Sequence, residues 1–135
     1  MNKKMNNIEK LTEVCALLVY TAKIDDDYTD KEKKIISLFI KSQIKDENDI
    51  SKIMEEAEKL EKDSNHLLKF TNIIKQETLE SKSAIIQELW KTVLSDGNVD
   101  DYEANIMRRI CGLIYFPDKL SGEIKLNVIK TINSK

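Results

Sequence analysis

The feature that most constrains the fold of this chain is the spacing of its apolar residues, which recur every three or four positions along nearly its whole length. The first run comprises Ile8, Leu11, Cys15, Leu18 and Ala22. Such spacing places apolar side chains on one face of an α-helix, and no segment alternates convincingly with the period of two that a strand requires. We expect helices near residues 6–23, 30–43, 47–62, 66–77, 81–95, 100–115 and 121–132. The sequence therefore predicts an all-α protein, a compact bundle of about seven helices.

Length and charge narrow the class of protein further. A chain of 135 residues fits one domain, so we expect a single helical domain over residues 1–135. With 22 basic and 24 acidic residues it has no cationic excess to neutralise phosphates, which argues against a nucleic-acid partner. Its apolar runs are too short for a transmembrane helix, and Glu9, Lys10 and Glu13 interrupt any signal-peptide core. We therefore expect a cytoplasmic protein without direct membrane insertion.

The two cysteines, Cys15 and Cys111, are far apart and form no CxxC motif. Both fall within apolar helical stripes, which favours packing in the core over a redox or metal role. The sequence alone leaves a disulfide between them open.

An acidic loop occurs twice. The first acidic loop is Asp25-Asp26-Asp27-Tyr28-Thr29-Asp30-Lys31-Glu32, and the second is Asp96-Gly97-Asn98-Val99-Asp100-Asp101-Tyr102-Glu103. Each position of the second loop lies 71 residues after its counterpart in the first. Each loop also follows one predicted helix and precedes another. The constant register predicts two pseudo-repeated halves, each a helix, an acidic loop and a helix.

Part of each loop is explained by helix capping. Thr29 and Glu32 form the pattern of a capping box, and so do Asp100 and Glu103. In this motif the cap side chain accepts a hydrogen bond from a free backbone N–H, and the glutamate three residues later accepts one from the cap residue. Both patterns predict helix starts.

Capping does not explain Asp25 and Asp96, which lie where the preceding helix ends and where the helix dipole disfavours a carboxylate. If the two loops pack together, Asp25, Glu32, Asp96 and Glu103 converge, and a divalent cation would relieve their repulsion. Four oxygen donors favour Ca²⁺, Mg²⁺ or Mn²⁺ over Zn²⁺. Two alternatives stay open: the acids are simply solvated, or Arg108 or Arg109 neutralises them.

Other site types fit the sequence poorly. The loops are not EF-hands, because Asp30 and Asp101 occupy the sixth position, which requires Gly, while Ile36 and Met107 occupy the twelfth, which requires Glu. The single histidine, His66, has no obvious nucleophile or acid partner in the sequence, and no glycine-rich phosphate loop is present. We therefore expect no enzymatic activity and no small-molecule substrate.

Several of these motifs together resemble a known family. They are Glu88-Leu89-Trp90-Lys91-Thr92-Val93-Leu94-Ser95-Asp96-Gly97, then Asp101-Tyr102-Glu103, then Arg108-Arg109-Ile110. The chain is similar to the bacterial tellurite-resistance TerB-like family over about residues 14–125. The resemblance implies an all-helical domain of two related halves whose acidic positions, proposed as a metal site, fall on Asp25, Glu32, Asp96 and Glu103. It also implies a non-enzymatic role in bacterial stress response, near membrane-associated tellurium-resistance components. Asp26 departs from the family, which usually has glycine there.

The sequence thus favours a non-enzymatic helical binding module with a divalent-cation site and a protein partner, and the resemblance implies a membrane-associated complex. The alternative is a metal-free interaction scaffold of the same fold. We further interpret Trp90 as a core residue, and Gly112 as a point where another helix approaches closely.

Overall fold

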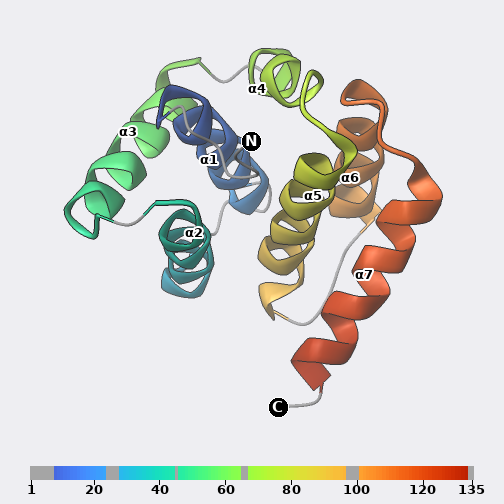
Figure 1. The fold of residues 1–135 in the computed structure, drawn as a ribbon. Helices are drawn as coiled ribbons and strands as arrows, with labels where there is room; N and C mark the ends of the chain where they lie inside the picture. The colour runs from blue at the N-terminus through green and yellow to red at the C-terminus, as the bar shows by residue number, and fades with distance from the viewer. Residues whose placement is uncertain (1–7, 24–27, 45, 65–66, 97–100, 134–135) are drawn as a thin grey trace.

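The computed structural model describes residues 8–23, 28–44, 46–64, 67–96 and 101–133 (Figure 1). These residues form seven α-helices, one short 3-10 helix and no strand. The α-helices are α1 (Ile8–Ala22), α2 (Asp30–Gln43), α3 (Asn48–Ser64), α4 (Leu67–Ile74), α5 (Leu79–Val93), α6 (Asp101–Leu113) and α7 (Asp118–Asn133), and the 3-10 helix η1 spans Leu94–Asp96. The all-α prediction is confirmed.

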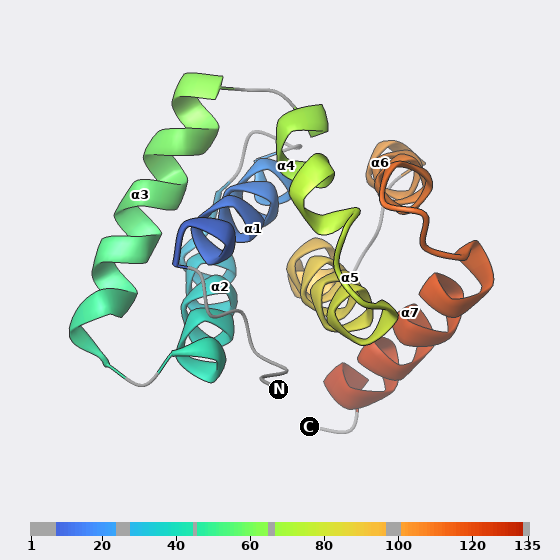
Figure 2. The same ribbon diagram turned by 45° about the horizontal axis from the view of Figure 1, so that its top comes forward.

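Helix α1 is the most enclosed element of the fold. It packs against α2, α3, α4 and α5 (Figures 1 and 2). Its buried residues lie all around the helix rather than on one stripe, because it has neighbours on several sides. The second central helix is α5, which contacts α1, α2, α6 and α7. One hydrophobic core joins these helices, and its largest fully buried side chains include Leu11, Leu17, Phe70, Ile86 and Ile110.

Several helix boundaries differ from the predicted ones. Helix α5 begins at Leu79, two residues early, because the Thr78 side chain caps it by accepting a hydrogen bond from the Ser81 N–H at 3.1 Å. Helix α7 begins at Asp118, directly after Pro117, whose carbonyl accepts from the Ser121 N–H. Helix α6 ends at Leu113, two residues early, since Tyr115 adopts a φ of 59° and the Phe116 N–H turns back to the Cys111 carbonyl.

The interpretation of Gly112 as a close-approach point is wrong. A Cβ atom built on Gly112 meets nothing within 4 Å, and the residue is exposed. The apolar residues around it in sequence, such as Cys111 and Ile114, face the core instead.

Both cysteines are free thiols buried in the core, at 0% and 1% exposure for Cys15 and Cys111. The packing role is confirmed, and the alternative of a disulfide between them is wrong. Burial raises the pKa of both thiols.

Candidate functional site

The first acidic loop ends in a complete capping box. The backbone N–H of Thr29 and its hydroxyl both donate to Oε1 of Glu32, at 2.8 and 3.1 Å. In return the Glu32 N–H donates to Thr29 Oγ1 at 3.2 Å. Glu32 is only 6% exposed although its carboxylate lies at the start of α2. The predicted capping role of this pair is therefore confirmed.

Tyr28 connects the same loop to α3. Its hydroxyl donates to Oε2 of Glu58 at 2.8 Å, and nearby Lys23 forms an ion pair with Glu61 at 2.9 Å. The ammonium groups of Lys23 and Lys33 lie 5.8 and 5.0 Å from the centre of the Tyr28 ring. Burial, the hydrogen bond to Glu58 and the negative charges of Glu58 and Glu32 together raise the pKa of Tyr28 far above its usual range. The sequence gives no sign of this attachment, because its partners are about thirty or more residues apart.

In the second acidic loop the structure describes Glu103, which lies in the first turn of α6 and is 7% exposed. Its predicted cap, Asp100, lies outside the described residues. Thus both of the loops place a buried glutamate in the first turn of a helix, at counterpart positions.

The other two predicted ligands cannot be located. Asp25 lies outside the described residues, and so does the side chain of Asp96, whose backbone ends η1. Among the described side chains, no three acids, histidines or cysteines come together in a way that would hold a metal ion. The four-carboxylate site predicted from the sequence therefore stays a prediction.

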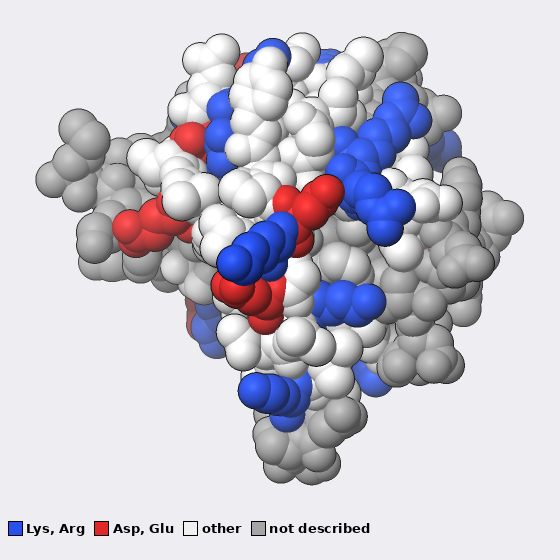
Figure 3. Space-filling model, turned by 90° about the vertical axis from the view of Figure 1, so that its right-hand side faces the viewer, with Lys and Arg blue, Asp and Glu red and all other residues white. Residues whose placement is uncertain are grey.

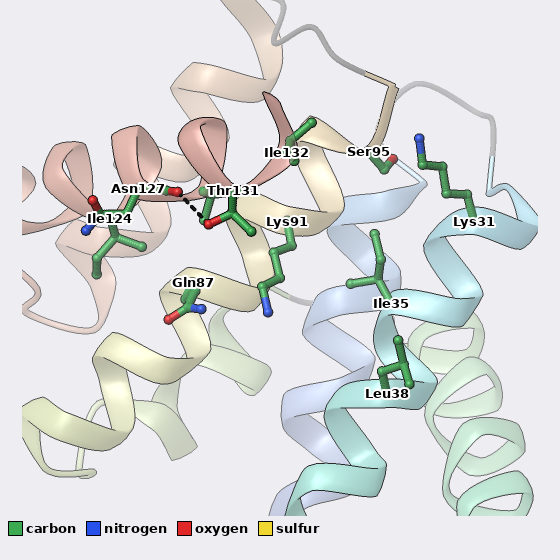
Figure 4. Close-up of a pocket in the computed structure, with 11 residues that line it drawn as sticks. Lys31, Ile35, Leu38, Gln87, Lys91, Ser95, Ile124, Asn127, Thr131 and Ile132 are labelled. Carbon is green, nitrogen blue, oxygen red and sulfur yellow. Dashed lines mark hydrogen bonds between the residues drawn. The ribbon is translucent and has the colours of Figure 1, made fainter. Parts of the chain in front are cut away.

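A residue of the first acidic loop and the residue just before the second acidic loop line the same hollow. Lys31, which precedes Glu32, and Ser95, which precedes Asp96, both line a hollow of about 560 Å³ (Figure 4). The rest of its lining comes from three helices: Ile35 and Leu38 of α2, Gln87 and Lys91 of α5, and Ile124, Asn127, Val128, Thr131 and Ile132 of α7. We call this hollow the α2–α5–α7 groove. It was not anticipated from the sequence.

The remaining candidates are on the surface or outside the described residues. Arg108 and Arg109 are exposed on α6, and no ion pair joins either to an acid that the structure describes. His66 lies in an undescribed segment. Figure 3 shows that acidic and basic side chains are interspersed on the face that includes α7, so this face carries charges of both signs.

The fold and the paired loops define a class: a small helical protein in which two acidic loops each lead into a helix with a buried glutamate. A family model described as tellurite resistance protein TerB matches residues 11–126. The chain therefore belongs to the TerB family. No curated protein and no solved structure matches the chain significantly. In the described segments, no helix combines the length and apolar character needed to cross a membrane.

Proposed function

We propose that this TerB domain is a non-enzymatic binding module in which Asp25, Glu32, Asp96 and Glu103 hold one divalent cation, Ca²⁺, Mg²⁺ or Mn²⁺. The observation that carries the proposal is the placement of Glu32 and Glu103, two carboxylates at counterpart positions of the two acidic loops, each in the first turn of a helix. A cation between the loops would join four carboxylates that otherwise repel one another.

The donor chemistry fits such an ion. All four proposed ligands offer oxygen atoms, which hard cations prefer, and none offers sulfur or imidazole nitrogen. Lys31 and Ser95 line the same groove, so the first turn of α2 and the end of η1 lie on the same side of the protein. When bound, the cation would tie the first half of the chain to the second.

The alternative is a metal-free scaffold of the same fold, and one observation favours it. Oε1 of Glu32 already accepts two hydrogen bonds from Thr29, which accounts for part of its burial without an ion. In that case the acidic loops are structural, and binding depends on other surfaces. In either case we propose a protein partner, within a membrane-associated complex of the bacterial stress response to tellurite, and a cytoplasmic location. The description of the matching family, tellurite resistance protein TerB, supports the connection with tellurite.

Thermal unfolding with EDTA and then with millimolar Ca²⁺, Mg²⁺ or Mn²⁺ tests the metal site. An ion at 100 times its Kd stabilises the folded state by about 2.7 kcal/mol. For a domain of this size, that raises Tm by roughly 10 °C. The double variant Asp25→Asn, Asp96→Asn should lose the rise. Its matched control, Glu55→Gln with Glu56→Gln on the exposed side of α3, should keep it.

Two results would decide against the proposed metal site. The first is an unchanged Tm with all three ions, which would establish the metal-free scaffold. The second is an equal rise in the wild type and in the Asp25→Asn, Asp96→Asn variant, which would place the ion elsewhere.

A further inference from the structure

The α2–α5–α7 groove has the shape of a helix bundle that lacks one member. Helix α5 packs against both α2 and α7, and its residues Gln87 and Lys91 lie between their side chains (Figure 4). From α2 the lining residues are Lys31, Ile35 and Leu38, which follow the i, i+4, i+7 spacing of one helix face. From α7 the spacing is similar, at Ile124, Val128 and Ile132. Faces with this spacing ordinarily pack against another helix.

The groove is also more apolar than a solvated surface requires. Leu38 is 55% exposed and Ile132 is 41% exposed, and both side chains border the same hollow. Ile35 and Ile124 are partly exposed beside them, and Val128 forms part of the floor. A contiguous apolar patch on a small protein is typical of an interaction site, whereas single exposed apolar residues are not.

The charges of the groove restrict its occupant. Among the described residues that line it, the two charged side chains, Lys31 and Lys91, are both cationic. Lys91 forms an ion pair with Glu88 at 3.2 Å, whereas Lys31 is exposed and makes no ion pair with any described acid. An occupant with acidic residues beside its apolar face would complement Lys31, and one with basic residues there would be repelled.

A second copy of this chain is a poor candidate. Outside the groove, the exposed large apolar residues of the described segments never occur twice on one helix; they are Ile8, Leu68, Leu79, Tyr115 and Leu126. Outside the groove, no described helix therefore offers the exposed apolar stripe that the groove would receive. We therefore assign the occupant to another protein.

We propose that the α2–α5–α7 groove binds an acidic amphipathic helix of a partner protein, with apolar anchors at i, i+3 or i+4, and i+7. This inference rests on the part of the proposed function that assigns the domain a protein partner, and it does not depend on the metal. Leu38 and Ile132 contact the anchors from opposite walls, and Lys31 pairs with an acid of the occupant.

The test is selection from a displayed library of 18-residue helical peptides, followed by titration of the purified full chain with the enriched peptides. We expect apolar residues at the stated spacing with Asp or Glu beside them. The double variant Leu38→Ser, Ile132→Ser should weaken binding at least tenfold. The matched control Leu126→Ser, an exposed leucine of α7 outside the groove, should change Kd less than twofold. Lys31→Glu should weaken the acidic peptides and strengthen variants in which their acids are replaced by lysine.

Three results would overturn the inference. One is the absence of any helical peptide whose binding depends on Leu38 and Ile132. Another is concentration-dependent dimerisation that the double variant abolishes, since the occupant would then be a second copy. The third is groove-dependent binding to phosphatidylglycerol vesicles without peptide binding, since the occupant would then be a lipid surface. Each is independent of the EDTA and cation melts, so the metal proposal and this one fail separately.

Discussion

The indole nitrogen of Trp90 donates a hydrogen bond to the hydroxyl of Ser121 at 3.0 Å, and this buried contact joins α5 to α7. Trp90 is 5% exposed and Ser121 is 5% exposed. Lys125 lies 5.2 Å from the centre of the Trp90 ring and covers it from α7.

Replacement of Ser121 by alanine should therefore lower the free energy of unfolding by about 1–3 kcal/mol, because it leaves a buried indole N–H without a partner. Urea denaturation followed by the fluorescence of Trp90, the only tryptophan, measures the change directly. The matched control is Ser51→Ala on the exposed side of α3, which should stay within about 0.5 kcal/mol of the wild type. Equal effects of the two substitutions would show that the Trp90 contact contributes nothing.

Replacement of a helical glycine by alanine should have the opposite effect and stabilise the protein. A Cβ atom on Gly122 in α7 meets no atom within 4 Å, and the same holds for Gly112 in α6. Gly122→Ala should raise the free energy of unfolding by about 0.5–1 kcal/mol, since alanine loses less backbone entropy on helix formation. The reverse change at an exposed helical site, Ala84→Gly in α5, should lower it by a similar amount. Chemical denaturation of the three proteins provides the measurement, and a destabilised Gly122→Ala variant would contradict the prediction.

Glu88 should make the free energy of unfolding depend on pH in the acid range. Burial raises the pKa of this carboxyl above 4.5, and the Lys91 ammonium opposes the rise. Because the folded state holds the proton more tightly than the unfolded state, the contribution of this proton is complete below pH 4.5 and is lost as the pH rises through the folded-state pKa. The free energy of unfolding of the wild type, minus that of Glu88→Gln, should therefore increase as the pH falls from 7 towards 4.5. A matched subtraction with Glu56→Gln, an exposed acid of α3, should show no such increase. A difference that falls on acidification would reverse the sign and refute the assignment.

The helices were predictable because local spacing determines them. Apolar residues three and four apart make one helix face wherever they occur, and the observed helices follow that pattern. The ends were less predictable, because a cap depends on one side chain with the right backbone angles. Thr78 caps α5 and Tyr115 ends the turn after α6 at a positive φ, and neither residue is marked by the apolar pattern.

The features of the candidate site also fall into two kinds: those that a local sequence pattern predicts and those that depend on how the helices pack. The bond between Thr29 and Glu32 spans three residues, so the capping-box pattern was enough to predict it. The contact of Tyr28 with Glu58 spans 30 residues, and the α2–α5–α7 groove joins residues from Lys31 to Ile132. Such features depend on how helices pack, which no local pattern contains. The convergence of Asp25 and Asp96 belongs to this second kind, and it stays a prediction.

The Tyr28–Glu58 bond itself provides the last prediction. Tyr28→Phe removes the donor and should lower the free energy of unfolding at pH 7 by about 1–2 kcal/mol, because the acceptor is a carboxylate and the pair is partly buried. Tyr115→Phe, at a side chain that is 70% exposed, is the matched control and should change it by less than about 0.5 kcal/mol.

The same pair should respond to alkali. The folded state raises the pKa of Tyr28 from 10.0, so the stability that its proton confers is complete below pH 10 and is lost as the pH rises above it. Urea denaturation at pH 7, 10 and 11 should show the wild type losing stability relative to Tyr28→Phe across that range. If the difference between the two proteins is constant from pH 7 to 11, then the Tyr28 hydroxyl is not held by Glu58, and the first acidic loop is not fastened to α3 in the way described.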